Sequence, residues 1–165
     1  MSEYIDEDLM FDALGKIDIS SQLTYQDLQT SQSFSISVCY DYVDLDKTPY
    51  HFRQEFHNID IKTYFERMHE ICKSNILNLF EKPRDWHFSS SCLKGNLLRE
   101  LKKLDKDVVK GNPMIFHFAL YTSKEGADRK TGVRSPRIYF MLGKYGRIFP
   151  LFFDPYHEIN PMTNL

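Results

Sequence analysis

Three apolar segments in the C-terminal half constrain the fold of this chain more than any other feature. They are MIFHFALYT at 114–122, RIYFML at 137–142 and RIFPLFF at 147–153. Short runs rich in aromatic and β-branched residues and bounded by turn residues are typical of β-strands. The connections between them are too short for helical crossovers, so we predict that these segments pair as an antiparallel sheet.

The last two of these segments are predicted to form a β-hairpin around the sequence GKYG. With this four-residue connection, Leu142 would pair with Arg147, and Arg137 would lie opposite Phe152. Pro150 has no backbone N–H to donate. Its strand is therefore expected to be an edge strand, or to have its free side at this position.

The N-terminal half contains one strand-like and one helix-like pattern. Residues 33–42 alternate between polar and apolar side chains, which predicts a strand with one buried face. Residues 61–81 carry apolar side chains at spacings of three and four, which predicts a long amphipathic helix with Phe65 and Met68 in the middle of its buried stripe. Pro83 lies just beyond this helix and is expected to end it.

These elements together indicate an α+β fold. A shorter helix is predicted over 97–104, and WHFSS at 86–90 could be a further short strand. We therefore expect a mainly antiparallel sheet of four to five strands, with one long and one shorter helix packed on one face. Residues 1–32 are expected to form an acidic, flexible arm, and residues 33–165 a single domain.

Charge is unevenly distributed along the chain, although the net charge is only −2. Residues 1–60 carry 12 acidic and 3 basic side chains, whereas residues 82–147 carry 15 basic and 6 acidic ones. Such a split indicates either a surface that faces a polyanion or an internal pairing of the two halves. A third interpretation is that folding interleaves the two sets into an ordinary mixed surface.

Several classes of protein are disfavoured by what the sequence lacks. It has no apolar run of about 18 residues, and its start has no basic segment followed by an apolar one, so we expect a cytoplasmic protein without a membrane partner. Three widely spaced cysteines suggest reduced thiols rather than a disulfide framework or a zinc site. Phosphate-loop, dinucleotide-binding and zinc-protease motifs are absent, and we predict no metal and no cofactor.

Residues that could perform chemistry are predicted to gather at the open end of the last hairpin. Arg137 begins one strand, and the segment Tyr156, His157 and Glu158 follows the other. An arginine can neutralise a phosphate, and a histidine can transfer protons near neutral pH. We therefore select these four residues as candidate catalytic groups of a metal-independent ribonuclease.

Basic residues elsewhere in the chain could bind the flanking phosphates of a nucleic acid. These candidates, from the loop before Arg137 and from the predicted helix over 97–104, are Arg129, Lys130, Arg134, Arg99, Lys102 and Lys103. The structural alternative is that Asp154 and Pro155 form a turn that ends the sheet, that His157 caps it, and that the loop is basic for solubility.

The order of the parts from about 61 to 158 resembles that of RelE/HigB-like ribonuclease toxins. The segments that carry the resemblance are KGNL at 94–97, RIYF at 137–140 and His157 in the C-terminal segment. The resemblance implies helices before a run of antiparallel strands, RNA as the substrate and a cognate antitoxin as a protein partner. The ending FFDPYHEINP also looks like that of small uncharacterised proteins from bacteria and mobile elements.

The sequence leaves three functions open. The first is a toxin-like, RNA-directed ribonuclease of a toxin–antitoxin or defence module. The second is a non-catalytic module from a mobile element that binds nucleic acid or protein. The third is an interaction protein that uses its acidic arm to bind a basic partner.

Overall fold

A five-stranded sheet forms the centre of the protein, in a computed structural model that describes residues 23–81 and 87–161. The strand order is β1-β5-β4-β3-β2, with β1 and β5 parallel and the other pairs antiparallel. The predicted α+β class with a mainly antiparallel sheet is confirmed. The strands are β1 (Ser37–Val38), β2 (Ser89–Ser91), β3 (Ile115–Ala119), β4 (Arg137–Leu142) and β5 (Arg147–Asp154).

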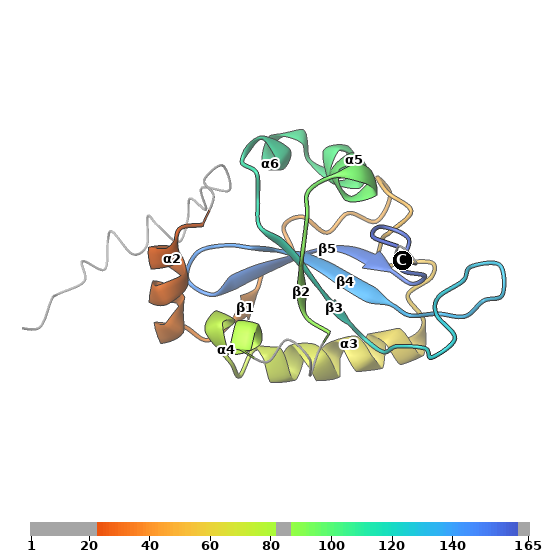
Figure 1. Cartoon of the computed structure of the whole chain (residues 1–165), viewed down its shortest axis with the longest axis horizontal. Coiled ribbons are helices and arrows are strands. Elements are labelled where there is room, and N and C mark those ends of the chain that lie inside the picture. Colours follow the sequence, from red (N-terminus) through yellow and green to blue (C-terminus); the bar gives the residue numbers. More distant parts are fainter. Residues whose placement is uncertain (1–22, 82–86, 162–165) are drawn as a thin grey trace, which may run out of the picture.

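Helices cover both faces of this sheet (Figure 1). One face packs against α3 and α4, and the other against α5 and α6. The prediction that the long and the shorter helix share a face is therefore wrong. The helical elements are α2 (Tyr25–Thr30), the 3₁₀ helix η1 (Ser31–Ser33), α3 (Asn58–Ile71), α4 (Ile76–Glu81), α5 (Gly95–Leu104) and α6 (Lys106–Lys110).

Burial along the central strands explains why two layers of helices are needed. All six residues of β4 are buried, so both of its faces are apolar. Ile138 and Phe140 belong to the core on the α3 side, whereas Tyr139 and Met141 belong to the core on the α5 side. A strand buried on both faces requires cover on both, because either face left exposed would place apolar surface in water.

The long helix predicted over 61–81 is two helices with a break between them. Cys72 caps the end of α3, and the side chain of Asn75 accepts a hydrogen bond from the backbone N–H of Asn78 in α4 (3.0 Å). The buried stripe of α3 is also rotated from the prediction. Met68 is buried as expected, but Phe65 is 59% exposed, so its assignment to the core is wrong.

Much of the N-terminal strand predicted over 33–42 is irregular. Only Ser37–Val38 pairs with the sheet, and η1 occupies the residues just before Phe34. Residues 23–32, the end of the predicted acidic arm, form α2 and η1 at one end of the sheet (Figure 1). The remainder of the predicted arm, 1–22, lies outside the described residues.

The C-terminal hairpin forms as predicted, but with a different register. Leu142 pairs with Ile148, and beyond a shift at Tyr139 and Phe140 the pairing brings Arg137 opposite Asp154. The predicted partners of Leu142 and Arg137 are therefore wrong. β5 is an internal strand, although its pairing with β1 ends at Ile148, before Pro150.

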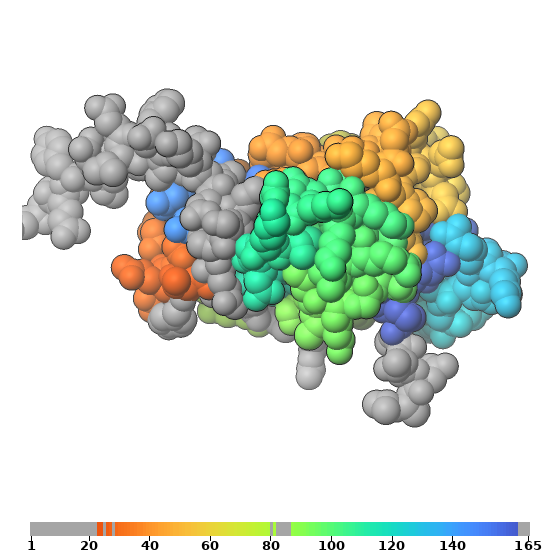
Figure 2. Space-filling model, turned by 90° about the horizontal axis from the view of Figure 1, so that it is seen from above, coloured from red at the N-terminus to blue at the C-terminus, as the bar shows by residue number. Residues whose placement is uncertain are grey.

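The outer surface of α5 and α6 lies beside the segment 39–57, and the loop between β3 and β4 projects at one end of the molecule (Figure 2). A hydrogen bond from Lys47 Nζ to the Leu104 carbonyl oxygen (3.3 Å) joins that segment to α5. Within residues 23–81 and 87–161, no helix has the length and apolar character needed to cross a membrane.

Candidate functional site

A cavity of about 530 Å³ opens where β2, β3, the start of β4, the β3–β4 loop and the turn after β5 meet. Its walls combine imidazole, guanidinium and hydroxyl groups, and no carboxylate lines it among the described residues. Such a set of donors favours an anionic ligand. The polar lining residues are His87, His117, His157, Arg137, Ser89, Thr122, Ser123 and Ser135.

His117 is held in this cavity by two hydroxyl groups from the neighbouring strand. It lies directly opposite Ser89 in the β2–β3 pairing. Its Nε2 is 3.0 Å from Ser89 Oγ, and its Nδ1 is 2.7 Å from Ser91 Oγ. Both serines project from the same face of β2, because side chains two residues apart lie on one side of a strand. The ring is therefore fixed through both of its nitrogens.

His157 enters the cavity from the turn that follows β5. The buried carboxylate of Asp154 accepts hydrogen bonds from the backbone N–H groups of Glu158 (2.9 Å) and Ile159 (2.7 Å), which closes the turn. His157 has a φ of 56°, a left-handed conformation that costs a non-glycine residue energy. The rings of His157 and His117 lie 6.1 Å apart, centroid to centroid.

Arg137 provides a fixed positive charge at the same cavity. The residue is 6% exposed and only borders the cavity. Its Nη1 donates to the Ser135 carbonyl (2.9 Å), to Ser135 Oγ (3.0 Å) and to the Pro136 carbonyl (3.2 Å). The guanidinium is therefore anchored to the backbone that leads into β4.

The environment keeps both histidines neutral at neutral pH. Burial, with smaller contributions from His157 and Arg137, lowers the pKa of His117 to about 4. Burial and then Arg137 lower the pKa of His157, also to about 4. Asp154 behaves in the opposite way, because burial raises the pKa of its carboxyl group to about 6. Neutral imidazoles can accept protons, and an anion placed beside them would raise their pKa values.

A second cavity, of about 630 Å³, adjoins the first and shares His157 with it. Arg129 lies over the ring of Tyr156 at 4.4 Å from its centroid. The guanidinium of Arg129 pairs with Glu158 (2.8 Å) and Glu55 (2.7 Å), and these two carboxylates raise its pKa. Tyr156 and Glu158, both predicted to be catalytic, thus lie in the second cavity, beside the histidine pair.

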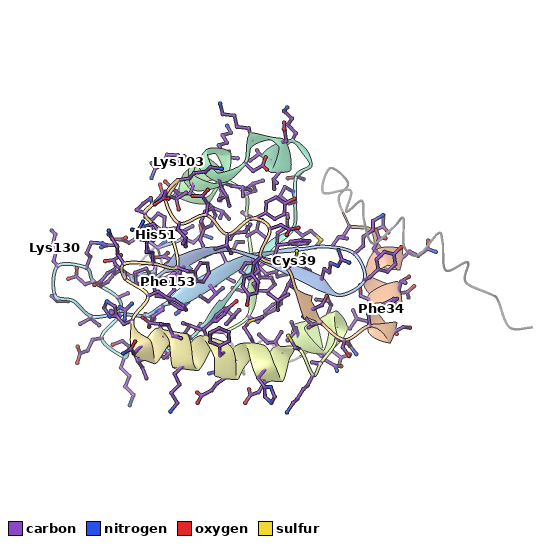
Figure 3. The ribbon with its side chains drawn as sticks, turned by 180° about the vertical axis from the view of Figure 1, so that it is seen from behind. Phe34, Cys39, His51, Lys103, Lys130 and Phe153 are labelled. Atoms are coloured by element: carbon purple, nitrogen blue, oxygen red, sulfur yellow. The ribbon has the colours of Figure 1, made fainter. Side chains whose placement is uncertain are left out.

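The predicted phosphate-binding residues lie in three different environments. Lys130 is exposed at the tip of the β3–β4 loop, far from Lys103 on α5 (Figure 3). Arg99 and Lys103 lie outside the cavity and pair with the buried Glu100 at 3.2 Å and 3.0 Å, while Lys102 is exposed on the same helix.

Arg134 is mostly buried and has a structural environment. Its Nη2 pairs with the fully buried Asp60 (2.8 Å) and donates to the Glu55 carbonyl (2.6 Å). Its Nη1 lies 3.1 Å from His57 Nδ1. Because its charge is already compensated inside the protein, we no longer assign phosphate binding to this residue.

Sequence analysis did not select His117, Ser89 or Ser91 for the site. His117 is a half-buried residue of β3 with a hydrogen bond at each ring nitrogen. Only the pairing register of β2 and β3 shows that Ser89 and Ser91 lie beside His117. A strand as short as β2 has too few residues for its pattern to fix that register.

Searches against protein-family models, curated proteins and solved structures find no match for this chain.

The lowered histidine pKa values predict a loss of stability in acid. An unfolded histidine has a pKa near 6.5, so between about pH 6.5 and 4 the unfolded chain binds more protons than the folded one. The free energy of unfolding should therefore fall as the pH drops through this window. Asp154 acts in the opposite sense below about pH 6, because its carboxyl binds a proton more readily when folded.

Urea denaturation of the wild type and of His117→Gln at pH 7.5, 6.0, 5.0 and 4.5 measures this contribution. We expect the variant to lose less stability than the wild type between pH 6.5 and 4.5. The matched variant His69→Gln removes an exposed histidine of α3 that lies outside the cavity. If the free energy of unfolding fell equally with pH in His117→Gln and in the wild type, the lowered pKa assigned to His117 would be contradicted.

Proposed function

We propose that this protein is a toxin-like, metal-independent ribonuclease. The observation that carries the proposal is the meeting of two half-buried imidazoles and an anchored guanidinium in one cavity. Cleavage of RNA by its own 2′-hydroxyl requires a group that removes the hydroxyl proton, one that protonates the leaving 5′-oxygen and a cation for the phosphate. The cavity contains side chains suited to all three tasks.

Each residue has a role in this proposal. Arg137 stabilises the negative charge that develops on the phosphoryl oxygens. His157 exchanges a proton directly with the substrate. His117 is the second proton-transfer group and acts through the hydroxyl of Ser89, which is hydrogen-bonded to its Nε2. A bound phosphate opposes the charge of Arg137 and so raises both histidine pKa values towards the range useful at neutral pH.

The second cavity would accommodate the next nucleotide of the strand. Tyr156 and Arg129 present a stacked ring and guanidinium there, and Lys130 is exposed at its rim. Aromatic rings and arginines contact bases by stacking, and lysines attract the backbone. Glu158 acts here by orienting Arg129 rather than by transferring protons.

A non-catalytic nucleic-acid-binding module is the second candidate, favoured by the basic surface of α5. Arg99 and Lys103 have side chains that are 62% and 46% exposed, and Lys102 is exposed between them. These charges lie away from the histidine cavity. Binding through them would weaken steeply with salt, because the bound strand releases counterions.

Incubation of the protein with single-stranded RNA in the presence of EDTA tests the ribonuclease proposal. We expect cleavage that leaves 2′,3′-cyclic phosphate ends. His157→Asn, in which asparagine tolerates the left-handed backbone, should lower the rate by a factor of ~100, as expected for loss of a general acid or base. His69→Gln should retain the wild-type rate.

Two other results would redirect the proposal. Cleavage by the wild type with full activity in both His157→Asn and His117→Gln would place the site elsewhere. Salt-dependent RNA binding without cleavage would favour the binding module. Growth arrest on expression of the wild type but not of His157→Asn would add support for the toxin role, whose protein partner would be an antitoxin.

A further inference from the structure

Ser89 stands in the position of a nucleophile rather than only of a proton carrier. Its hydroxyl is exposed, lines the cavity and lies 3.0 Å from Nε2 of His117. The opposite ring nitrogen of His117 is held by Ser91 Oγ at 2.7 Å. Hydroxyl, imidazole and orienting acceptor therefore follow one another in the order of a nucleophile, its general base and the group that fixes the base.

The protonation states are consistent with this order. At neutral pH the imidazole of His117 is uncharged and carries one ring proton. With that proton on Nδ1, the ring donates to Ser91, and Nε2 is left to accept the hydroxyl proton of Ser89. Arg137 lines the same cavity and can stabilise negative charge on a group that Ser89 attacks.

We propose that Ser89 attacks phosphodiesters directly, so that the protein also cleaves single-stranded DNA through a covalent phosphoserine. This inference uses the phosphate site of the proposed ribonuclease but does not need its 2′-hydroxyl chemistry. A strand without 2′-hydroxyls has no internal nucleophile, and Ser89 supplies one. The adjoining cavity with Tyr156 and Arg129 binds bases and backbone without requiring a ribose hydroxyl.

Attack of Ser89 on the phosphodiester is a transesterification. Ser89 Oγ forms a bond to phosphorus while its proton passes to Nε2 of His117. The bond between phosphorus and the 5′-oxygen breaks, and that oxygen leaves as a hydroxyl with a proton from a cavity histidine. Water then attacks the 3′-phosphoseryl intermediate, which restores Ser89 and leaves a 3′-phosphate.

A single-stranded DNA pool with randomised flanks around one 5′-bridging phosphorothiolate traps the intermediate. Its thiolate leaving group departs readily and rejoins poorly, so the labelled upstream strand should build up on Ser89 before water hydrolyses the ester. A denaturing quench within the first turnover should then retain the strand on the protein in a gel. We expect the adduct with the wild type and its loss in Ser89→Ala. The matched control is Ser90→Ala, which removes an exposed hydroxyl from the opposite face of β2 and should keep the adduct.

Mass spectrometry of peptides from the adduct should locate the attached nucleotide on Ser89. Absence of an adduct with the folded wild type, or equal adduct in Ser89→Ala, overturns the inference. Parallel assays with RNA separate it from the proposed function. RNA cleavage without the DNA adduct would support the ribonuclease and contradict the role of Ser89 as a nucleophile. The DNA adduct without 2′,3′-cyclic phosphate ends on RNA would support that role of Ser89 and contradict the ribonuclease.

Discussion

Replacement of Asp60 by alanine is expected to destabilise the protein by ~3–5 kcal/mol, because it removes one partner of a buried ion pair. The Asp60 carboxylate is fully buried and pairs with Nη2 of Arg134 at 2.8 Å. It also accepts hydrogen bonds from Tyr121 Oη (2.8 Å) and from the backbone N–H of His57 (2.8 Å). Alanine would leave all three donors without this acceptor.

The guanidinium of Arg134 makes this loss severe. Its side chain is only 13% exposed, so water could replace the lost carboxylate only in part. Asp60 also closes the capping box at the start of α3, and that helix covers one face of the sheet. The same carboxylate thus connects the β3–β4 loop to α3, and its removal loosens both.

Denaturant unfolding of Asp60→Ala, compared with Asp107→Ala, measures the effect. Asp107 pairs with Lys110 at 2.6 Å, but both side chains are exposed. Exposed pairs contribute ~0–1 kcal/mol, so the control should unfold nearly as the wild type does. Similar losses for the two variants would contradict a buried role for Asp60.

The placement of the candidate site at the open end of the last hairpin was predictable from the sequence. Arg137 and His157 lie at the same cavity even though the predicted register was wrong. A shift of one or two residues moves a pairing by only a few ångströms, so it does not carry a side chain to the other end of a hairpin. The position of the turn along the chain therefore sufficed to place these two residues at the same end of the hairpin.

Ion pairs between residues far apart in the sequence could not be predicted. Arg134 meets Asp60 and Arg129 meets Glu55 across a separation of about seventy residues. Local patterns report which residues are charged but not which opposite charge folding brings near. The basic loop before β4 therefore looked like a phosphate-binding segment, whereas two of its arginines hold the loop to the rest of the protein.

Helix periodicity located α3 but not the orientation of its face. Phe65 and Met68 share the predicted stripe, but only Met68 is buried. The stripe in the structure is centred on Asp60, Tyr64, Met68 and Ile71. Asp60 lies before residue 61, where the predicted helix began, and it is buried because its ion pair and hydrogen bonds compensate its charge.

Phe140 belongs to a part of the core that the sequence does predict, because it lies in the apolar segment RIYFML. Its side chain is 1% exposed on β4, and its ring centroid lies 5.7 Å from that of Phe88, 6.1 Å from Phe116 and 5.9 Å from Phe118. Phe140→Ala is expected to cost ~3–5 kcal/mol, because neighbouring rings fixed on paired strands cannot move in to fill the space.

Phe65→Ala provides the matched comparison, since it deletes the same ring from the surface of α3. With 59% of Phe65 exposed, little apolar area returns to water, and alanine favours the helix. The expected loss is within ~0.5 kcal/mol, as for surface substitutions in general. Urea denaturation of both variants decides the orientation of α3: equal losses would mean that Phe65 is buried and that the helix presents another face to the sheet.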